Sequence, residues 1–154
     1  MTKQIIKSLA ILALVVGLMA AAVASVYAQT PTFVTADVPF DFIVADKTMP
    51  SGEYIARVAS TNGLRISSPD GKSSAMRLSN LAVEAGKTGD ARLVFRRYGQ
   101  QYFLAEVWFG DNYGRQLLRC DRERHLRNEL ASNASKSDTA KASYEIVEVI
   151  AQVR

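Results

Sequence analysis

The sequence predicts an all-β fold, an antiparallel meander that forms a sandwich or a partly open barrel, with one short helix near the C-terminal third. Three observations lead to this class. Apolar and polar residues alternate with a period of two over most of the chain after residue 28. Turn-forming residues interrupt this alternation at short intervals. A charged stretch around residues 119–130 lacks this alternation and favours a helix instead. Short strands with tight turns pack as sandwiches or barrels.

The first 28 residues have the pattern of an export signal. Two lysines and no acid precede an uncharged run from Leu9 to Ala24, and Val26 and Ala28 occupy the −3 and −1 positions of a cleavage site before Gln29. The alternative is an uncleaved membrane anchor over residues 9–26, because about 18 apolar residues approach the lower limit for a spanning helix. We expect residues 1–28 to be a signal peptide and residues 29–154 to form a single β domain that is periplasmic or extracellular.

The composition limits what this domain can be. The chain has 154 residues, of which 48% are apolar, which excludes disordered and collagen-like proteins. Its formal charge of +4 falls to +2 without the two lysines of the signal, so nothing in the whole-chain charge favours nucleic acid as a partner. Cys120 is the only cysteine, and an internal disulfide is therefore excluded. It is a half-buried small residue, a reactive thiol or half of an intermolecular disulfide.

The first predicted strand runs from Val38 to Val44, with apolar residues on one face and Asp41 on the other. Pro39 cannot donate a ladder hydrogen bond, which places it at a sheet edge or near the start of the strand. A turn at Met49–Gly52 leads into a second strand from Glu53 to Val58.

Two hairpins are expected from their turn residues. Asn62-Gly63 suits a type I′ turn that folds Tyr54–Val58 back onto Leu64–Ser67. Gly99-Gln100 suits a type II′ turn between Arg92–Tyr98 and Tyr102–Phe109, a pairing that places Arg97 opposite Tyr102 and Arg96 opposite Phe103. Between these hairpins we expect a reversal at Pro69–Gly71, a strand in which Met76 and Leu78 alternate with Arg77 and Ser79, and a loop from Glu84 to Asp90.

The C-terminal third begins with the one predicted helix, from Arg119 to Leu130. The pairs Arg119/Glu123 and Glu123/Arg127 have the i,i+4 spacing that stabilises a helix, and Leu126 and Leu130 would be its buried pair. Polar residues 132–143 are expected to form a flexible connector. The final strand, Tyr144–Val153, is mostly apolar on both faces, so it is either covered on both sides or paired late with the sheet.

The sequence offers little for catalysis or for metal binding. His125 is the only imidazole, and no nucleophile motif such as G-x-S-x-G occurs. His125 and Cys120 cannot fill a tetrahedral zinc site by themselves. We therefore expect no enzymatic activity, no catalytic residue, no metal and no cofactor.

Two groups of residues are candidate binding sites. The first is an aromatic–arginine surface on the second hairpin, suited to a glycan or a protein; its alternative role is the central hairpin of the core. Its members are Arg96, Arg97, Tyr98, Tyr102, Phe103 and Trp108. The second is a basic segment that either contacts an anionic surface or forms a solvated helix with internal ion pairs. Its members are Arg115, Arg119, Arg122, Arg124 and Arg127.

Two stretches resemble a group of small exported bacterial proteins to which no activity is assigned. The opening stretch is Val38-Pro39-Phe40-Asp41-Phe42, then Asp46-Lys47 and Pro50-x-Gly52-x-Tyr54. The second is Leu93-Val94-Phe95, Arg97-Tyr98-Gly99, Tyr102-Phe103-Leu104 and Trp108. The resemblance implies an exported β-rich domain, and it brings no catalytic residues with it.

We expect a non-enzymatic domain that acts through surface contacts with an envelope or extracellular protein or glycan. One alternative is a carrier of a small apolar ligand, with a hollow barrel lined by Phe40, Phe42, Leu104 and Trp108. A further alternative is an assembly in which the strand Tyr144–Val153 pairs with an edge of a neighbouring subunit. Membrane contact is expected only through the signal or an uncleaved anchor.

Overall fold

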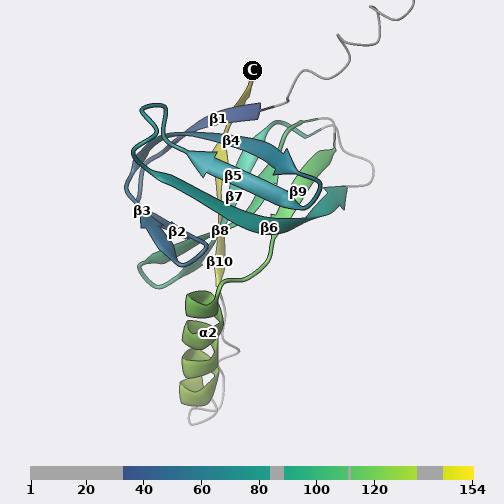
Figure 1. Cartoon of the computed structure of the whole chain (residues 1–154). Coiled ribbons are helices and arrows are strands. Elements are labelled where there is room, and N and C mark those ends of the chain that lie inside the picture. Colours follow the sequence, from purple (N-terminus) through teal and green to yellow (C-terminus); the bar gives the residue numbers. More distant parts are fainter. Residues whose placement is uncertain (1–32, 84–88, 111, 135–143) are drawn as a thin grey trace, which may run out of the picture. The chain divides into compact units, whose positions relative to one another are not determined.

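The computed structural model describes residues 33–83, 89–110, 112–134 and 144–154 (Figure 1). Contacts group residues 32–154 into one unit. Within the described ranges the elements are the strands β1 (Phe33–Val38), β2 (Phe42–Val44), β3 (Lys47–Met49), β4 (Gly52–Ser60), β5 (Gly63–Ser67), β6 (Ser74–Val83), β7 (Arg92–Tyr98), β8 (Gln101–Trp108) and β9 (Tyr113–Leu117), the helix α2 (Asp121–Ala134), and the strands β10 (Glu145–Ile150) and β11 (Gln152–Val153).

The strands follow the order β10-β7-β8-β9-β6-β5-β4-β1-β11 in a sheet that is not closed into a barrel. Strand β6 passes between two parts of this sheet. Its residues Ser74–Leu78 pair with β5, whereas Ser79–Val83 pair with β9. The C-terminal segment also joins both parts, since β10 pairs with β7 and β11 pairs with β1. The all-β class with one short helix is confirmed, and the parallel β2–β8 pairing makes the sheet mixed.

The main core lies between the two parts of the sheet. The ring of Phe42 packs edge-on against Tyr54 and Phe95, with centroids 4.9 and 5.4 Å apart. Tyr54 satisfies its buried hydroxyl by donating to the carbonyl oxygen of Pro50 at 2.7 Å. The apolar side chains of this core include Val34, Val38, Met49, Leu64, Ile66, Leu93, Leu104, Val107 and Leu117. A second, smaller cluster lies beneath α2 and contains Ile43, Tyr98, Phe103 and Cys120, with Leu126 packed against it.

The predicted strand Val38–Val44 is divided in two, which corrects that expectation. Strand β1 ends at Val38 and β2 begins at Phe42, so Pro39 lies in the break where no ladder donor is needed. The carboxylate of Asp41 accepts a hydrogen bond from the backbone N–H of Ser51 at 2.8 Å and holds the break against the next turn.

The hairpin between β4 and β5 is confirmed, but its predicted turn type is wrong. Thr61 and Asn62 occupy the loop with negative φ, and Gly63 already begins β5. The positive φ values that a type I′ turn needs occur between β2 and β3, at Ala45 (51°) and Asp46 (66°). A register shift between Val58 and Ser60 gives the β4–β5 loop the extra residue that makes another turn geometry possible.

The second hairpin agrees with its prediction. Gly99 has a φ of 59°, and the register pairs Arg97 with Tyr102 and Arg96 with Phe103. The reversal after Pro69 is also present, with Gly71 at a φ of 73° donating to the carbonyl oxygen of Ser68. The turn-forming residues alone therefore predicted these two chain reversals correctly.

Strand β6 has the opposite sidedness to the one its sequence suggests. Ser79 is buried, whereas Met76 and Leu78 are 63% and 60% exposed. Arg77 turns toward β9 and donates to the carbonyl oxygens of Leu118 and Arg119. The covered face of β6 is therefore the one that carries Arg77 and Ser79.

Helix α2 begins at Asp121 and continues to Ala134, so residues 132–134 are helical rather than part of a connector. The remainder of the predicted connector, residues 135–143, lies outside the described residues. Leu126 is half-buried, but Leu130 is 36% exposed and is not the expected buried partner. Figure 1 gives the reason, since the helix extends away from the strands toward its C-terminal end. The predicted signal, residues 1–28, also lies outside the described residues.

Candidate functional site

The structure divides the predicted aromatic–arginine surface instead of presenting it to solvent. Arg96, Tyr98 and Phe103 are buried, and Trp108 is 8% exposed at the other end of the hairpin. Only Arg97 and Tyr102 remain partly open, with the guanidinium of Arg97 5.5 Å from the tyrosine ring centroid. This burial favours the alternative role of these residues, the central hairpin of the core.

Two of these buried residues, Arg96 and Tyr98, hold α2 against the sheet through Glu123, which is 1% exposed. Arg96 donates to both carboxylate oxygens of Glu123, from Nε to Oε1 at 2.6 Å and from Nη2 to Oε2 at 3.2 Å. The Tyr98 hydroxyl donates to Oε1 at 3.2 Å, and Arg119 Nε lies 3.4 Å from the same oxygen. Burial and the neighbouring carboxylate raise the pKa of Tyr98. A buried charge persists only when it is paired and hydrogen-bonded in this way.

The start of α2 is capped by a residue from a distant turn. Asp46, in the β2–β3 turn, accepts a hydrogen bond from the backbone N–H of Arg122 at 2.9 Å. This bond lowers the pKa of the Asp46 carboxyl. Cys120 lies beside the cap and is 5% exposed, and burial raises the pKa of its thiol. The position of Cys120 agrees with a packed residue rather than a reactive thiol.

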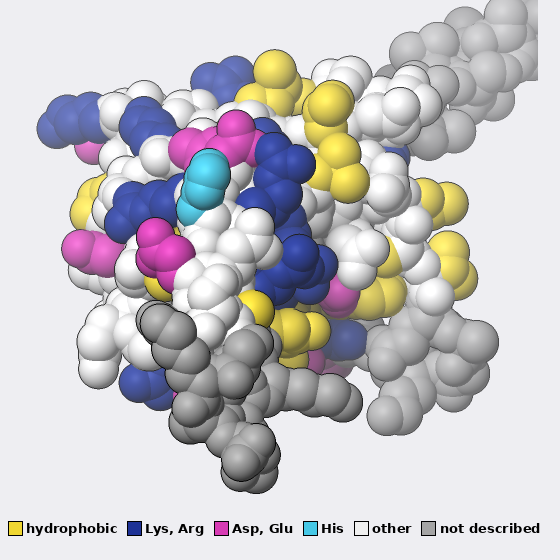
Figure 2. Space-filling view, turned by 90° about the horizontal axis from the view of Figure 1, so that it is seen from below, with side chains coloured by type: hydrophobic (Ala, Val, Ile, Leu, Met, Phe, Trp, Pro, Cys, Tyr) yellow, Lys and Arg dark blue, Asp and Glu magenta, His cyan; other side chains and the backbone are white. Residues whose placement is uncertain are grey.

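The predicted basic segment is dispersed and engaged within its own chain. Arg115 lies on β9, is 9% exposed and donates to the carbonyl oxygen of Thr61 at 2.7 Å. Arg122 donates to the side chains of Thr48 and Gln101. Arg119 pairs with Glu123, Arg124 pairs with Asp121, and Arg127 is half-buried. Figure 2 shows basic and acidic side chains mixed on the face that carries α2, which favours a solvated helix with internal ion pairs.

An open groove lies on the outer side of the strands β10, β7, β8, β9 and β6. Its volume is about 620 Å³, and its lining mixes apolar residues with charged and amide groups. The lining residues are Leu81, Ala82, Val83, Arg92, Val94, Glu106, Trp108, Gln116, Ile146 and Glu148.

The polar groups on the floor of this groove are already bonded to one another. Glu106 accepts from Trp108 Nε1 at 2.9 Å and from Gln116 Nε2 at 3.2 Å, one bond to each carboxylate oxygen. Arg92 lies 5.0 Å from the Trp108 ring centroid and 3.5 Å from a carboxylate oxygen of Glu148. Partner recognition by these groups would require breaking existing contacts.

The tryptophan ring covers the backbone of β9 at Gly114. A Cβ atom at Gly114 would lie 2.6 Å from the ring, so the close approach requires glycine. The ring fills the space that a side chain would otherwise occupy in this strand. Trp108 is thus a structural part of the groove floor and presents little free ring surface.

The rim of the groove is apolar and exposed. Leu81, Val83 and Ile146 have exposed fractions of 59%, 69% and 55%. None of these three residues belongs to a site predicted from the sequence. A signal was present for Ile146, because the final strand is mostly apolar on both faces and only the face with Val147 and Val149 packs on the core.

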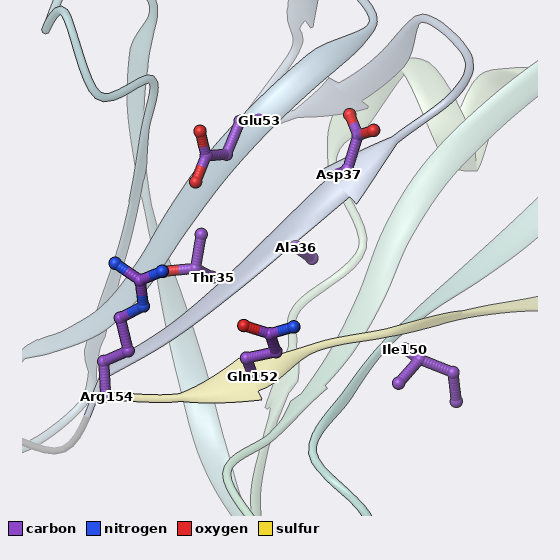
Figure 3. A pocket seen from close by; sticks show the side chains of 7 residues that line it. All are labelled: Thr35, Ala36, Asp37, Glu53, Ile150, Gln152 and Arg154. Carbon is purple, nitrogen blue, oxygen red and sulfur yellow. The ribbon is translucent and has the colours of Figure 1, made fainter.

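A second hollow, of about 420 Å³, lies beside β1, β4 and β11 (Figure 3). Asp37 and Glu53 occupy opposite positions of the antiparallel β1–β4 pair, and Arg154 and Gln152 approach from the C-terminal strand. The lining combines the apolar residues Ala36 and Ile150 with polar side chains, all of which are exposed or half-buried. Within the described ranges, no group of three metal-ligating side chains is found, and His125 is exposed on α2.

Comparison of the chain with protein-family models, with curated proteins and with solved structures gives no match. The resemblance to small exported bacterial proteins therefore stays a prediction. In the part of the chain that the structure describes, no helix has the length and apolar character needed to cross a membrane.

Proposed function

We propose that the chain is an exported, non-enzymatic binding domain whose outer groove receives an extended, mainly apolar segment of another exported protein. The observation that carries the proposal is the combination of an exposed apolar rim with a floor whose polar groups are already paired. A groove of this kind gains free energy from burying apolar side chains and offers few open hydrogen-bonding groups to a ligand.

The same observations favour a protein partner over a glycan. Sugar binding uses open aromatic faces and free polar groups, but Trp108 is 8% exposed and both oxygens of Glu106 are engaged. The carrier alternative receives less support, because Phe42 and Leu104 are buried within a packed core. The predicted signal peptide, residues 1–28, supports the exported location.

Site-specific photo-crosslinking in producing cells tests the groove. A photoreactive residue at Ile146, on the rim, is expected to join the full chain to a discrete partner protein. The matched control is Met76, which is 63% exposed on the part of β6 paired with β5. Products from both positions, or from neither, would contradict the proposal.

A binding measurement on the mature chain, residues 29–154, completes the test. Ile146→Asp is expected to lower the affinity for the identified partner by about ten- to a hundredfold, because burying an isoleucine contributes about 1.5–3 kcal/mol to binding. Native mass spectrometry of the same protein distinguishes the carrier alternative from the groove proposal. A co-purifying apolar molecule bound in stoichiometric amount would favour the carrier and overturn the groove proposal.

A further inference from the structure

The second half of β6, Ser79–Val83, is a sheet edge with backbone groups that the described residues leave open. Strand β5 pairs with β6 only as far as Leu78, whereas β9 accompanies β6 from Ser79 to Val83 on the opposite side. The second half of β6 therefore has a neighbouring strand on one side only.

The direction of the free groups follows from two printed hydrogen bonds. The backbone N–H of Ser79 donates to Asn62, on the β5 side, and the carbonyl oxygen of Leu78 accepts from Leu118, on the β9 side. Alternate residues of an antiparallel strand direct their N–H and C=O groups to the same side. Leu81 and Val83 thus direct theirs, like Ser79, to the side without a strand.

This edge lacks the features that usually prevent strand addition. Natural edge strands carry lysines, prolines, inward charges or bulges that block pairing with another chain. Residues 79–83 read Ser-Asn-Leu-Ala-Val, with no charge and no proline. The side chains of Leu81 and Val83 are also exposed, at 59% and 69%.

We propose that this edge pairs with the same edge of a second copy of the chain, antiparallel about a two-fold axis at Leu81. In that register Leu81 lies opposite Leu81 of the second copy, and Ser79 lies opposite Val83 of the second copy. Because Ser79 already uses its N–H, about four intermolecular backbone hydrogen bonds form. The uncharged sequence makes the edge self-complementary, since no like charges meet across the axis.

The charge on β10 supports this choice of edge. Strand β10 also ends the strand order and exposes Ile146 and Ile150, but it carries Glu145 and Glu148. Each of these acids is in an ion pair with an arginine of β7, and two copies of β10 would bring four such acids together. The inference does not depend on the groove receiving a partner, although Leu81 and Val83 also line the groove.

Sedimentation over a concentration series of the mature chain, in reductant, tests the inference. The wild type is expected to form a concentration-dependent dimer, and Leu81→Lys and Leu81→Glu are each expected to be monomers because like charges meet at the axis. An equimolar mixture of the two variants is expected to restore a dimer. Leu78→Lys is the matched control, because Leu78 is similarly exposed but pairs with Gly63 of β5, on the side that the edge leaves open.

Three results would overturn the inference. A wild type that stays monomeric at every concentration would show that the edge does not pair with a second copy, and a strand from a different protein would then be its partner. A dimer that survives both Leu81 variants places the contact elsewhere, for example in an exchange of the C-terminal strand. A failure of the mixed variants to associate, with each correctly folded by circular dichroism, removes the two-fold pairing. Ile146→Asp is expected to leave the dimer intact. A test of this variant therefore distinguishes a failure of the dimer inference from a failure of the proposal that the groove binds a partner.

Discussion

Arg96 and Glu123, 27 residues apart in the chain, form a buried two-point ion pair with its shorter contact at 2.6 Å. Arg96 belongs to the central hairpin and Glu123 to the first turn of α2. The pair is a buried polar connection between this helix and the strands, and Tyr98 donates a further hydrogen bond to it.

Removing one partner of this pair is expected to cost much more than removing an exposed acid. Glu123→Ala leaves the guanidinium of Arg96 buried without its carboxylate, so the free energy of unfolding should fall by about 3–5 kcal/mol. Glu129→Ala, an exposed change on the same helix, should stay within about 0.5 kcal/mol. Urea unfolding measures both. Equal losses in the two variants would show that the ion pair does not stabilise the docked helix.

The cap from Asp46 is expected to give a stability term that depends on pH. Asp46→Ala removes the acceptor for the Arg122 N–H and should lower the free energy of unfolding by about 1 kcal/mol at neutral pH. The pKa of Asp46 is lowered in the folded state. The stabilisation by its ionised carboxylate is therefore fully present above the ordinary pKa of 3.8, and it is lost as the pH falls through the folded pKa.

The difference in stability between wild type and Asp46→Ala should therefore narrow in acid. Urea unfolding at neutral pH and at a series of acidic pH values measures this. Asp46→Asn retains an oxygen acceptor without the charge and should recover part of the loss. A difference that is constant with pH would contradict a role for the ionised carboxylate.

The close contact of Trp108 with Gly114 is expected to make glycine necessary on β9. Gly114→Ala places a Cβ 2.6 Å from the indole ring and should lower stability by about 1–3 kcal/mol through overpacking. Trp108 is the only tryptophan, so its fluorescence and near-ultraviolet circular dichroism report the displaced ring directly. In a Trp108→Leu background, Gly114→Ala should lower the free energy of unfolding by a smaller amount. Equal costs in both backgrounds would mean that the ring is not what requires glycine.

The Cys120 thiol is expected to be unreactive in the folded protein. It is 5% exposed and burial raises its pKa, so little thiolate is present at neutral pH. Alkylation should be slow in buffer and fast in denaturant, and a non-reducing gel of the folded protein should show a monomer. Rapid labelling of the native protein, or a disulfide-linked dimer, would contradict this.

Several elements could be predicted because short-range chemistry determines them. The hairpin across Gly99 and its register follow from a glycine at the first turn position between two apolar runs. The i,i+4 pair of Arg119 and Glu123 is likewise confirmed at 3.4 Å. Arg119 precedes α2, so its ion pair with Glu123 spans the start of the helix. In both cases residues close together in the sequence were sufficient for the prediction.

The candidate sites were harder to predict, because exposure depends on which elements cover one another. The aromatic hairpin would be a surface if α2 lay elsewhere, but the docked helix buries Arg96, Tyr98 and Phe103. Met76 and Leu78 alternate with polar residues as core residues do, yet they are exposed. Periodicity shows that a strand has two different faces and does not show which face is covered.

The sequence by itself determined the β class, the positions of most turns and the expectation of an export signal, since these depend on neighbouring residues. Tertiary structure alone decided that Arg96 and Glu123 pair, that Asp46 caps a helix 76 residues away and that half of β6 has one neighbouring strand. Each of these relationships joins segments far apart in the chain. Their geometry exists only once the two parts of the sheet and the helix have packed, because burial and open edges are properties of the assembled layers.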